Sequence, residues 1–230
     1  MSDPIDIPPT PEASLVRISS RTAAILLIFT VVFTALMALT YTATKPVLEA
    51  SAEAERLKLI DELLPRSEYD NALLKDTIYL PAEPALGMDE PTQAWRARRN
   101  GMPVALIIQA AAPDGYSGRI GLILAVRSDG RLAAVRVTQH RETPGLGDYI
   151  DPKKDRNKPH PWIGQFNEHD LAHTPVERWK VKKDGGVYDQ RAGATISARA
   201  VTNATQRALA WITPRIDRLF AVSTDVEYQE

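Results

Sequence analysis

An uncharged stretch near the N-terminus constrains this chain more than any other feature. Residues 22–44 contain no Asp, Glu, Lys or Arg and are rich in Leu, Ile, Val, Phe and Ala. A helix of that length reaches roughly 34 Å, which is enough to cross the hydrocarbon core of a bilayer. We therefore predict a single transmembrane helix over residues 22–44, preceded by a tail over residues 1–21.

A cleaved signal peptide is the main alternative for this stretch. The apolar region of a signal peptide is shorter, about 7–15 residues, and a small-residue cleavage site follows it closely. Ala50-Ser51-Ala52 has the form of such a site, but it lies beyond Lys45 and Pro46 in a stretch with a helical pattern. The length of the apolar stretch therefore favours an uncleaved anchor.

The orientation of the anchor rests on the tail, because basic residues flank both of its ends and the positive-inside rule does not decide. The short tail over residues 1–21 most simply stays in the cytoplasm. The rest of the chain, residues 45–230, is then the exported domain.

Composition excludes several classes of site. Lys and Arg total 28 and Asp and Glu total 29, so the net charge of −1 argues against a nucleic-acid-binding protein. The chain contains no cysteine, which rules out disulfides, zinc–thiolate sites and iron–sulfur ligation. His169 and His173 are four residues apart but lie in no clear helix. We therefore expect no metal site.

The segment after the anchor begins as a helix. Residues 46–64 place apolar side chains at helical spacing with charges between them, which predicts an amphipathic helix that stops before Pro65. Residues 65–100 are mixed and carry no clear pattern. We treat residues 45–100 as this helix and a connecting region.

Strand patterns follow. Residues 102–112, 118–126 and 131–139 are rich in Val, Ile, Leu and Ala, and the turn at residues 128–130 predicts that the last two form a hairpin. Residues 177–189 resemble a further hairpin with Gly185 and Gly186 in its turn. This order of elements predicts an α+β fold with a largely antiparallel sheet and flanking helices.

A Pro- and Gly-rich loop and a helix complete the pattern. Residues 140–175 are longer than an ordinary connection, and long ordered loops are often functional. A helical pattern then starts at Thr195 and is ended or kinked at Pro214. We assign one domain to residues 101–215 and a C-terminal tail to residues 216–230.

The start of that helix has two interpretations. Thr195 is a natural N-cap, whose side chain accepts a backbone hydrogen bond from the first helical turn. The same position also suits a phosphate, because free N–H groups and the positive end of the helix dipole point at it. The small neighbours Gly193 and Ala194 leave the Thr195 hydroxyl open to a large group. From the residues alone, both interpretations remain open.

Three motifs resemble one protein family. Asp189-x-x-Ala192-Gly193-Ala194-Thr195 resembles the flavinylation motif of FMN-binding subunits in bacterial respiratory complexes, although many members carry Ser or Thr at the position of Ala192. Gly115-Tyr116-Ser117-Gly118 and the stretch from His140 to Asp148 also match. With the single anchor ahead of them, roughly residues 22–215 resemble the RnfG family, the G subunits of the Rnf complex, which is an ion-translocating ferredoxin:NAD⁺ oxidoreductase.

The resemblance implies covalent FMN. A separate flavin transferase that uses FAD would join the terminal phosphate of FMN to the Thr195 hydroxyl, making Thr195 a phosphoryl-threonine attachment point and not a catalytic residue. Asp189, Gly193 and Ala194 would belong to the same cofactor site. We expect no catalytic residue of the chain's own, since the flavin supplies the electron chemistry.

The resemblance also implies flavin contacts in two loops. These contacts would come from Glu142, Thr143, Gly145, Leu146 and Gly147 in one loop and from Tyr116 and Ser117 in the other. Gly145 and Gly147 permit a close backbone approach, and Leu146 could pack on the ring. A purely structural turn is the alternative for each loop.

These features predict a membrane-anchored electron-transfer subunit of a translocase, with the other Rnf subunits as partners. Two alternatives remain. One is the C subunit of the Na⁺-translocating NADH:quinone reductase, which carries a similar threonyl-FMN. The other is a non-redox FMN-binding or assembly module.

Overall fold

A computed structural model describes residues 12–228. The chain divides between Ala54 and Glu55 into two compact units, and the second unit runs to the C-terminus. Most of the predicted tail, residues 1–11, lies outside the described residues.

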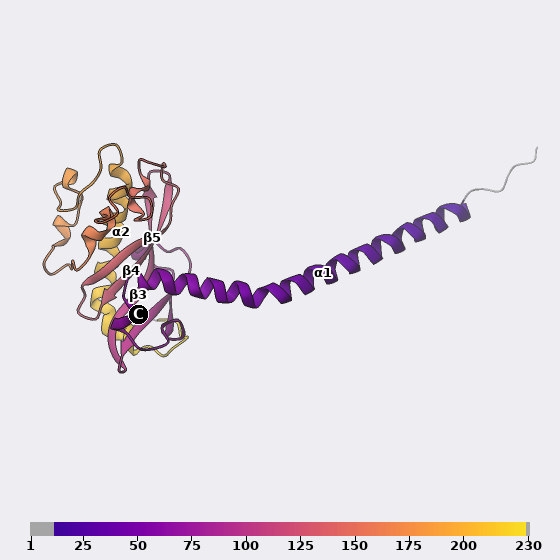
Figure 1. The fold of residues 1–230 in the computed structure, drawn as a ribbon, viewed down its shortest axis with the longest axis horizontal. Helices are drawn as coiled ribbons and strands as arrows, with labels where there is room; N and C mark the ends of the chain where they lie inside the picture. Colours follow the sequence, from indigo (N-terminus) through magenta and orange to yellow (C-terminus); the bar gives the residue numbers. More distant parts are fainter. Residues whose placement is uncertain (1–11, 229–230) are drawn as a thin grey trace, which may run out of the picture. The chain divides into compact units, whose positions relative to one another are not determined.

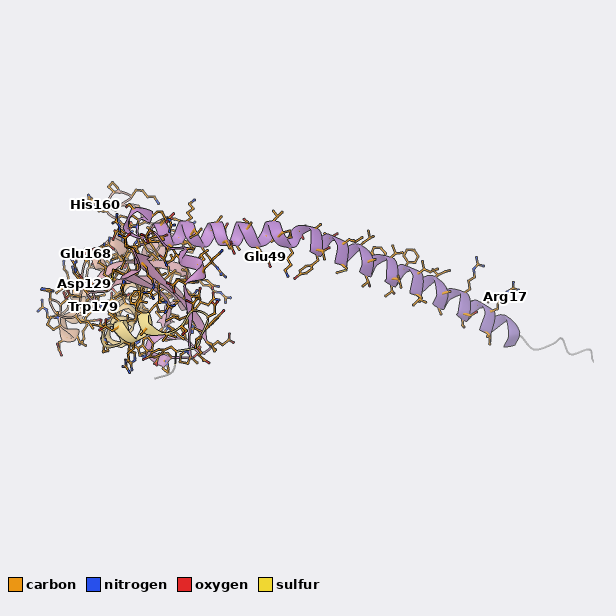
Figure 2. The ribbon with its side chains drawn as sticks, turned by 90° about the horizontal axis from the view of Figure 1, so that it is seen from below. Arg17, Glu49, Asp129, His160, Glu168 and Trp179 are labelled. Atoms are coloured by element: carbon orange, nitrogen blue, oxygen red, sulfur yellow. The ribbon has the colours of Figure 1, made fainter. Side chains whose placement is uncertain are left out.

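A single helix, α1 (Glu12–Asp61), covers both the predicted anchor and the predicted amphipathic segment. Figure 2 shows Arg17 near its N-terminal end and Glu49 in its second half. The part between them is long and apolar enough to cross a membrane. The hydroxyls of Thr30 and Thr40 donate to carbonyl oxygens four residues earlier, so these polar groups are satisfied inside the helix.

The second unit contains a five-stranded antiparallel sheet whose strand order follows the sequence. The strands are β1 (Thr77–Leu80), β2 (Thr92–Arg99), β3 (Met102–Gly115), β4 (Gly118–Arg127) and β5 (Leu132–Gln139). The predicted hairpin is confirmed, because β4 pairs antiparallel with β5. The predicted α+β class with an antiparallel sheet is confirmed as well.

The two faces of the sheet carry separate cores because successive strand residues point to opposite sides. On one face, α2 (Thr195–Ile212) packs along the sheet (Figure 1). That core contains Leu106, Ile108, Leu122, Leu124, Val201, Ala204 and Ala208. The other face buries Ile107 and Ile123 against Ile60 and Leu64 from the chain around the end of α1. Each buried Leu or Ile contributes about 1.5–3 kcal/mol of stability.

Strands β1 and β2 lie in residues 65–100, which carried no clear pattern. Strand β2 is hard to recognise in the sequence because one of its buried side chains is charged. Arg96 is only 2% exposed. Its guanidinium pairs with Asp76 at 2.5 Å and donates to carbonyl oxygens at the end of α3 (Ile216–Ala221). A charged side chain in a strand normally indicates a solvent face, whereas here it ties the C-terminal segment to the sheet.

The predicted hairpin over residues 177–189 is wrong. This stretch forms the 3₁₀ turns η6 (Val176–Arg178) and η7 (Lys182–Asp184), and a single β-bridge joins Val181 to Tyr188. The chain folds back so tightly that a Cβ at Gly186 would lie within 1.8 Å of the Lys180 carbonyl oxygen. Buried Trp179, Val181 and Tyr188 anchor the stretch to the core.

Helix α2 begins at Thr195, as predicted, and gives way after Ile212 to the short 3₁₀ turn η8 (Thr213–Arg215). Pro214 lies inside that turn. The predicted break at Pro214 is therefore confirmed.

Candidate functional site

The turn before α2 leaves the Thr195 hydroxyl unused. Ala194 is the N-cap residue, and no side chain caps the helix. Thr195 is instead the first helical residue, is half-buried, and its hydroxyl forms no hydrogen bond within residues 12–228. The N-cap interpretation of Thr195 is therefore wrong. Gly193 makes the turn possible, because its φ of +82° is one that L side chains rarely adopt.

The hydroxyl of Tyr149 braces this turn from η4 (Asp148–Ile150). It accepts a hydrogen bond from the Arg191 amide at 3.2 Å and donates one to the Ala194 carbonyl oxygen at 3.3 Å. The Arg191 guanidinium lies 4.5 Å from the centre of the Tyr149 ring. Burial raises the pKa of the Tyr149 phenol, although the Arg191 amide and charge act in the opposite direction.

Asp155 binds the guanidinium group of Arg191. Its carboxylate is fully buried, pairs with the Arg191 guanidinium and accepts from the amides of Trp162 at 2.7 Å and Asn157 at 2.9 Å. Burial opposes ionisation, but these donors outweigh it and hold the pKa of Asp155 below its usual value. The buried charge is thus paired and fully hydrogen-bonded.

Asp189 is fixed through its backbone by η5 (Trp162–Phe166). Its carbonyl oxygen accepts from Trp162 Nε1 at 2.6 Å, and its amide donates to Gln165 Oε1 at 2.7 Å. Its exposed carboxylate pairs with Lys182 at 2.6 Å. Asp189 lines a hollow of about 590 Å³ together with Pro161, Trp162 and Arg191.

A pocket of about 120 Å³ lies beside the start of α2. Three separate segments build it, namely the β3–β4 turn, the loop after β5 and the residues around the first turn of α2. It is lined by Tyr116, Glu142, Thr143, Leu146, Gly147, Gly193, Ala194, Ile196 and Ser197. Seven of these nine residues are predicted site residues. Ser117, Gly145, Asp189 and Thr195 are predicted site residues that do not line it.

The Glu142 carboxylate forms the polar wall of the pocket. It is 4% exposed, accepts from the Ser117 amide at 3.0 Å and receives a hydrogen bond from the Ser197 hydroxyl. Gly147 lies directly against this pair. A Cβ there would stand 2.8 Å from Ser197 Oγ and 3.0 Å from Glu142 Oε2.

The rim of the pocket is apolar and open. Tyr116, Leu146 and Ile196 are 67%, 47% and 44% exposed. Leu146 is held by its amide, which donates to the Thr143 carbonyl oxygen at 3.1 Å, and Gly145 supplies the positive φ that this loop requires. Three large exposed apolar side chains around one small pocket form a surface on which a planar ring can pack.

Sequence reasoning missed Ile196 and Ser197. Both belong to the first turn of α2, directly after Thr195. Their proximity to Thr195 was the available signal, because side chains in the first turn of a helix surround its N-terminal amides.

Two of the four histidines, His169 and His173, pair with other side chains. His169 Nδ1 lies 2.9 Å from the Tyr188 hydroxyl, and His173 pairs with Asp170. Within residues 12–228, no group of three or more His, Asp or Glu side chains is arranged to hold a metal ion.

Comparison with known proteins gives two family matches. Residues 115–210 match the FMN-binding domain, and residues 14–63 match the RnfG N-terminal region. The chain is 38% identical over 213 residues to the G subunit of the ion-translocating oxidoreductase complex of Pseudoalteromonas atlantica, covering 93% of this chain and 97% of that one. It is 42% identical over 211 residues to the Pseudomonas aeruginosa protein of the same name, covering 91% and 96%. Among solved structures, NqrC of Shewanella oneidensis aligns with a TM-score of 0.44 at 19% identity, over 68% of this chain and 74% of that one.

Proposed function

The chain belongs to the family of G subunits of ion-translocating oxidoreductase complexes, and from this membership we propose that it carries FMN covalently on Thr195 and relays electrons between other subunits. The observation that carries the proposal is the free Thr195 hydroxyl, which stands at an uncapped helix start beside the pocket. The FMN-binding domain match over residues 115–210 spans the pocket and Thr195.

The start of α2 fits a phosphate. The first amides of a helix have no partner inside the helix, and no side chain caps this one. A phosphoester on Thr195 would place acceptor oxygens where those amides and the positive end of the helix dipole favour negative charge. Gly193 and Ala194 add almost no side-chain bulk where a phosphate would approach the Thr195 hydroxyl.

The pocket fits one edge of a flavin rather than the whole ring. The volume of the pocket, about 120 Å³, is well below the roughly 300–1,000 Å³ of pockets that bury a drug-sized ligand. Tyr116, Leu146 and Ile196 would support the ring, and much of it would stay exposed. When bound, FMN accepts and donates the electrons, and an exposed ring suits a relay because a partner can approach it.

In the proposed attachment, Thr195 provides the oxygen for a new bond. Its Oγ1 forms a bond to the phosphorus of the FMN half of FAD, and the pyrophosphate bond at that phosphorus breaks. AMP leaves, and the hydroxyl proton is released. The flavin transferase performs this step once, so Thr195 holds the cofactor and takes no part in electron transfer.

Membership of the family also supports a proposal for the partners and the location. We place the chain in an Rnf-type complex that passes electrons between ferredoxin and NAD⁺ and couples this to movement of Na⁺ or H⁺. Helix α1 would anchor it in the bacterial inner membrane, with the unit after Ala54 on the periplasmic side. The match of residues 14–63 to the RnfG N-terminal region supports this choice over the quinone reductase alternative.

Intact mass tests the proposal. Full-length protein produced together with a flavin transferase should gain the mass of FMN less one water and fluoresce in a denaturing gel. Thr195→Ala should lose both signals, whereas Thr195→Ser should keep them because it retains a hydroxyl. Thr174→Ala is a matched control, since Thr174 is also half-buried and its hydroxyl forms no hydrogen bond within the described residues. An unmodified wild-type chain would overturn the proposal.

A further inference from the structure

Glu142 is a buried carboxylate for which the fold provides no cation. It is 4% exposed and forms no ion pair within residues 12–228. Burying an unpaired charge is costly, and buried carboxylates normally face Arg or Lys. Asp155, only 13 residues further along the chain, follows that rule by pairing with Arg191. Glu142 departs from it at the wall of the pocket.

The neighbours of Glu142 hold it in place without neutralising it. The Ser117 amide donates to Oε1 at 3.0 Å, and the Ser197 hydroxyl donates to Oε2. Both carboxylate oxygens are therefore hydrogen-bonded, Oε1 to a backbone amide and Oε2 to a hydroxyl. Three segments converge on this one side chain, so its position does not depend on a single loop.

The titratable groups around Glu142 do not supply a compensating charge. His140 Nδ1 accepts from the Glu142 amide at 3.1 Å, and His140 forms no ion pair with the Glu142 carboxylate within the described residues. Asp148 accepts from the Gly145 amide at 2.9 Å and is itself acidic. Arg141 is exposed and forms no ion pair with Glu142.

We infer that Glu142 lowers the midpoint potential of the flavin through its fixed negative charge, with Ser117 and Ser197 as positioning residues. This rests on the proposed function, because it requires FMN beside the pocket. Reduction brings electrons onto the flavin ring, and a negative charge in the pocket wall opposes their arrival. Because Glu142 is 4% exposed, water screens this interaction less than it screens one between two surface charges. An Arg or Lys paired with Glu142 would cancel this effect.

Glu142→Gln separates the charge from the hydrogen bonds. The glutamine Oε1 can still accept from the Ser117 amide, and Nε2 can donate to the Ser197 hydroxyl oxygen. The variant thus keeps the contacts and loses the charge. Glu177→Gln is the matched control, because Glu177 is exposed and lies outside the pocket. Glu142→Met is a second variant, which removes both the charge and the carboxylate oxygens.

The measurement is a potentiometric titration of full-length, FMN-loaded protein in detergent, with the loading of each variant confirmed first by mass. We expect Glu142→Gln to raise the midpoint potential by at least about 30 mV, a tenfold shift in the two-electron equilibrium. Glu177→Gln should leave the potential unchanged.

Three outcomes would overturn the inference. The first is an unchanged potential in a folded, loaded Glu142 variant, and the second is an equal shift in Glu177→Gln. The third is loss of folding in both Glu142→Gln and Glu142→Met by circular dichroism, which would make Glu142 purely structural. A wild-type chain without FMN would instead refute the proposed function itself, and the mass measurement detects that beforehand.

Discussion

The Tyr149 hydroxyl donates to the carbonyl oxygen of Ala194, with 3.3 Å between the two oxygens, one residue before Thr195. The same hydroxyl accepts from the Arg191 amide, so one phenol joins both ends of the turn that presents Thr195. The Ala194 amide also donates to the Arg191 carbonyl oxygen at 3.2 Å. The turn that presents Thr195 is therefore held by hydrogen bonds of the protein itself.

Tyr149→Phe should slow attachment of FMN while the protein stays folded. The change removes only the hydroxyl and should cost about 1 kcal/mol of unfolding free energy, the typical net value of one hydrogen bond. The rate is measured by following the mass gain over time with purified flavin transferase and FAD. Tyr79→Phe removes a hydroxyl in β1 that is hydrogen-bonded to Gln93, and this variant should react at the wild-type rate. Equal rates for wild type and Tyr149→Phe would show that the brace does not matter for attachment.

Gly147→Ala should destabilise the second unit. The new Cβ would press on Ser197 Oγ and Glu142 Oε2, both held by hydrogen bonds, and overpacking of this kind costs about 1–3 kcal/mol. Gly164→Ala is the control, because nothing lies within 4 Å of a Cβ there and its φ is not positive. It should stay within about 0.5 kcal/mol of wild type in urea unfolding. Equal stability of the two variants would argue against the tight packing around Glu142.

The lowered pKa of Asp155 predicts how the free energy of unfolding depends on pH. Its pKa is lower in the folded protein than in the unfolded chain, where it is about 3.9. The ionised carboxylate therefore stabilises the fold above that value, and the contribution is lost as the pH falls through the folded pKa.

The denaturation midpoints of wild type and Asp155→Asn should consequently differ most near neutral pH and converge below about pH 4. Asp217→Asn, at an exposed position, should show no such convergence. A gap between wild type and Asp155→Asn that stays constant from pH 7 to the acid range would contradict the prediction.

The absence of cysteine makes the proposed topology directly measurable. A single introduced cysteine is the only thiol in the protein and reports one side of the membrane. In intact spheroplasts, a membrane-impermeant maleimide should label Lys154→Cys, which lies in the second unit at an exposed position. Ser2→Cys should react only after lysis. The reverse pattern would invert the proposed orientation.

The sequence predicted the elements whose patterns are local. The three strand-like runs correspond to β3, β4 and β5, and the helical pattern after Gly193 corresponds to α2. The sequence did not predict β1, which has only four residues. It also did not predict β2, whose arginines gave the pattern of an exposed segment although the strand is largely buried. The burial of Arg96 depends on Asp76 and on carbonyl oxygens more than 120 residues away, and no local pattern reports such partners.

The site was predictable where family motifs mark it. Residues from all three motifs line one pocket, although Asp189 faces a different hollow and Thr195 stands beside the lining. Ser197 and Tyr149 were not predicted as site residues because their contacts depend on how distant segments meet. The Glu142 contact to Ser197 spans 55 residues, and the Tyr149 contact to Ala194 spans 45.

The segments around the pocket are synthesised at different times. Tyr116 is made 79 residues before Thr195, a delay of roughly 4–16 s at common rates of translation. The β3–β4 turn and the Glu142 loop must therefore wait for α2, whose first turn completes the pocket. All five strands, which end at Gln139, are synthesised before Thr195, so the FMN attachment proposed here can begin only after the whole sheet has been made.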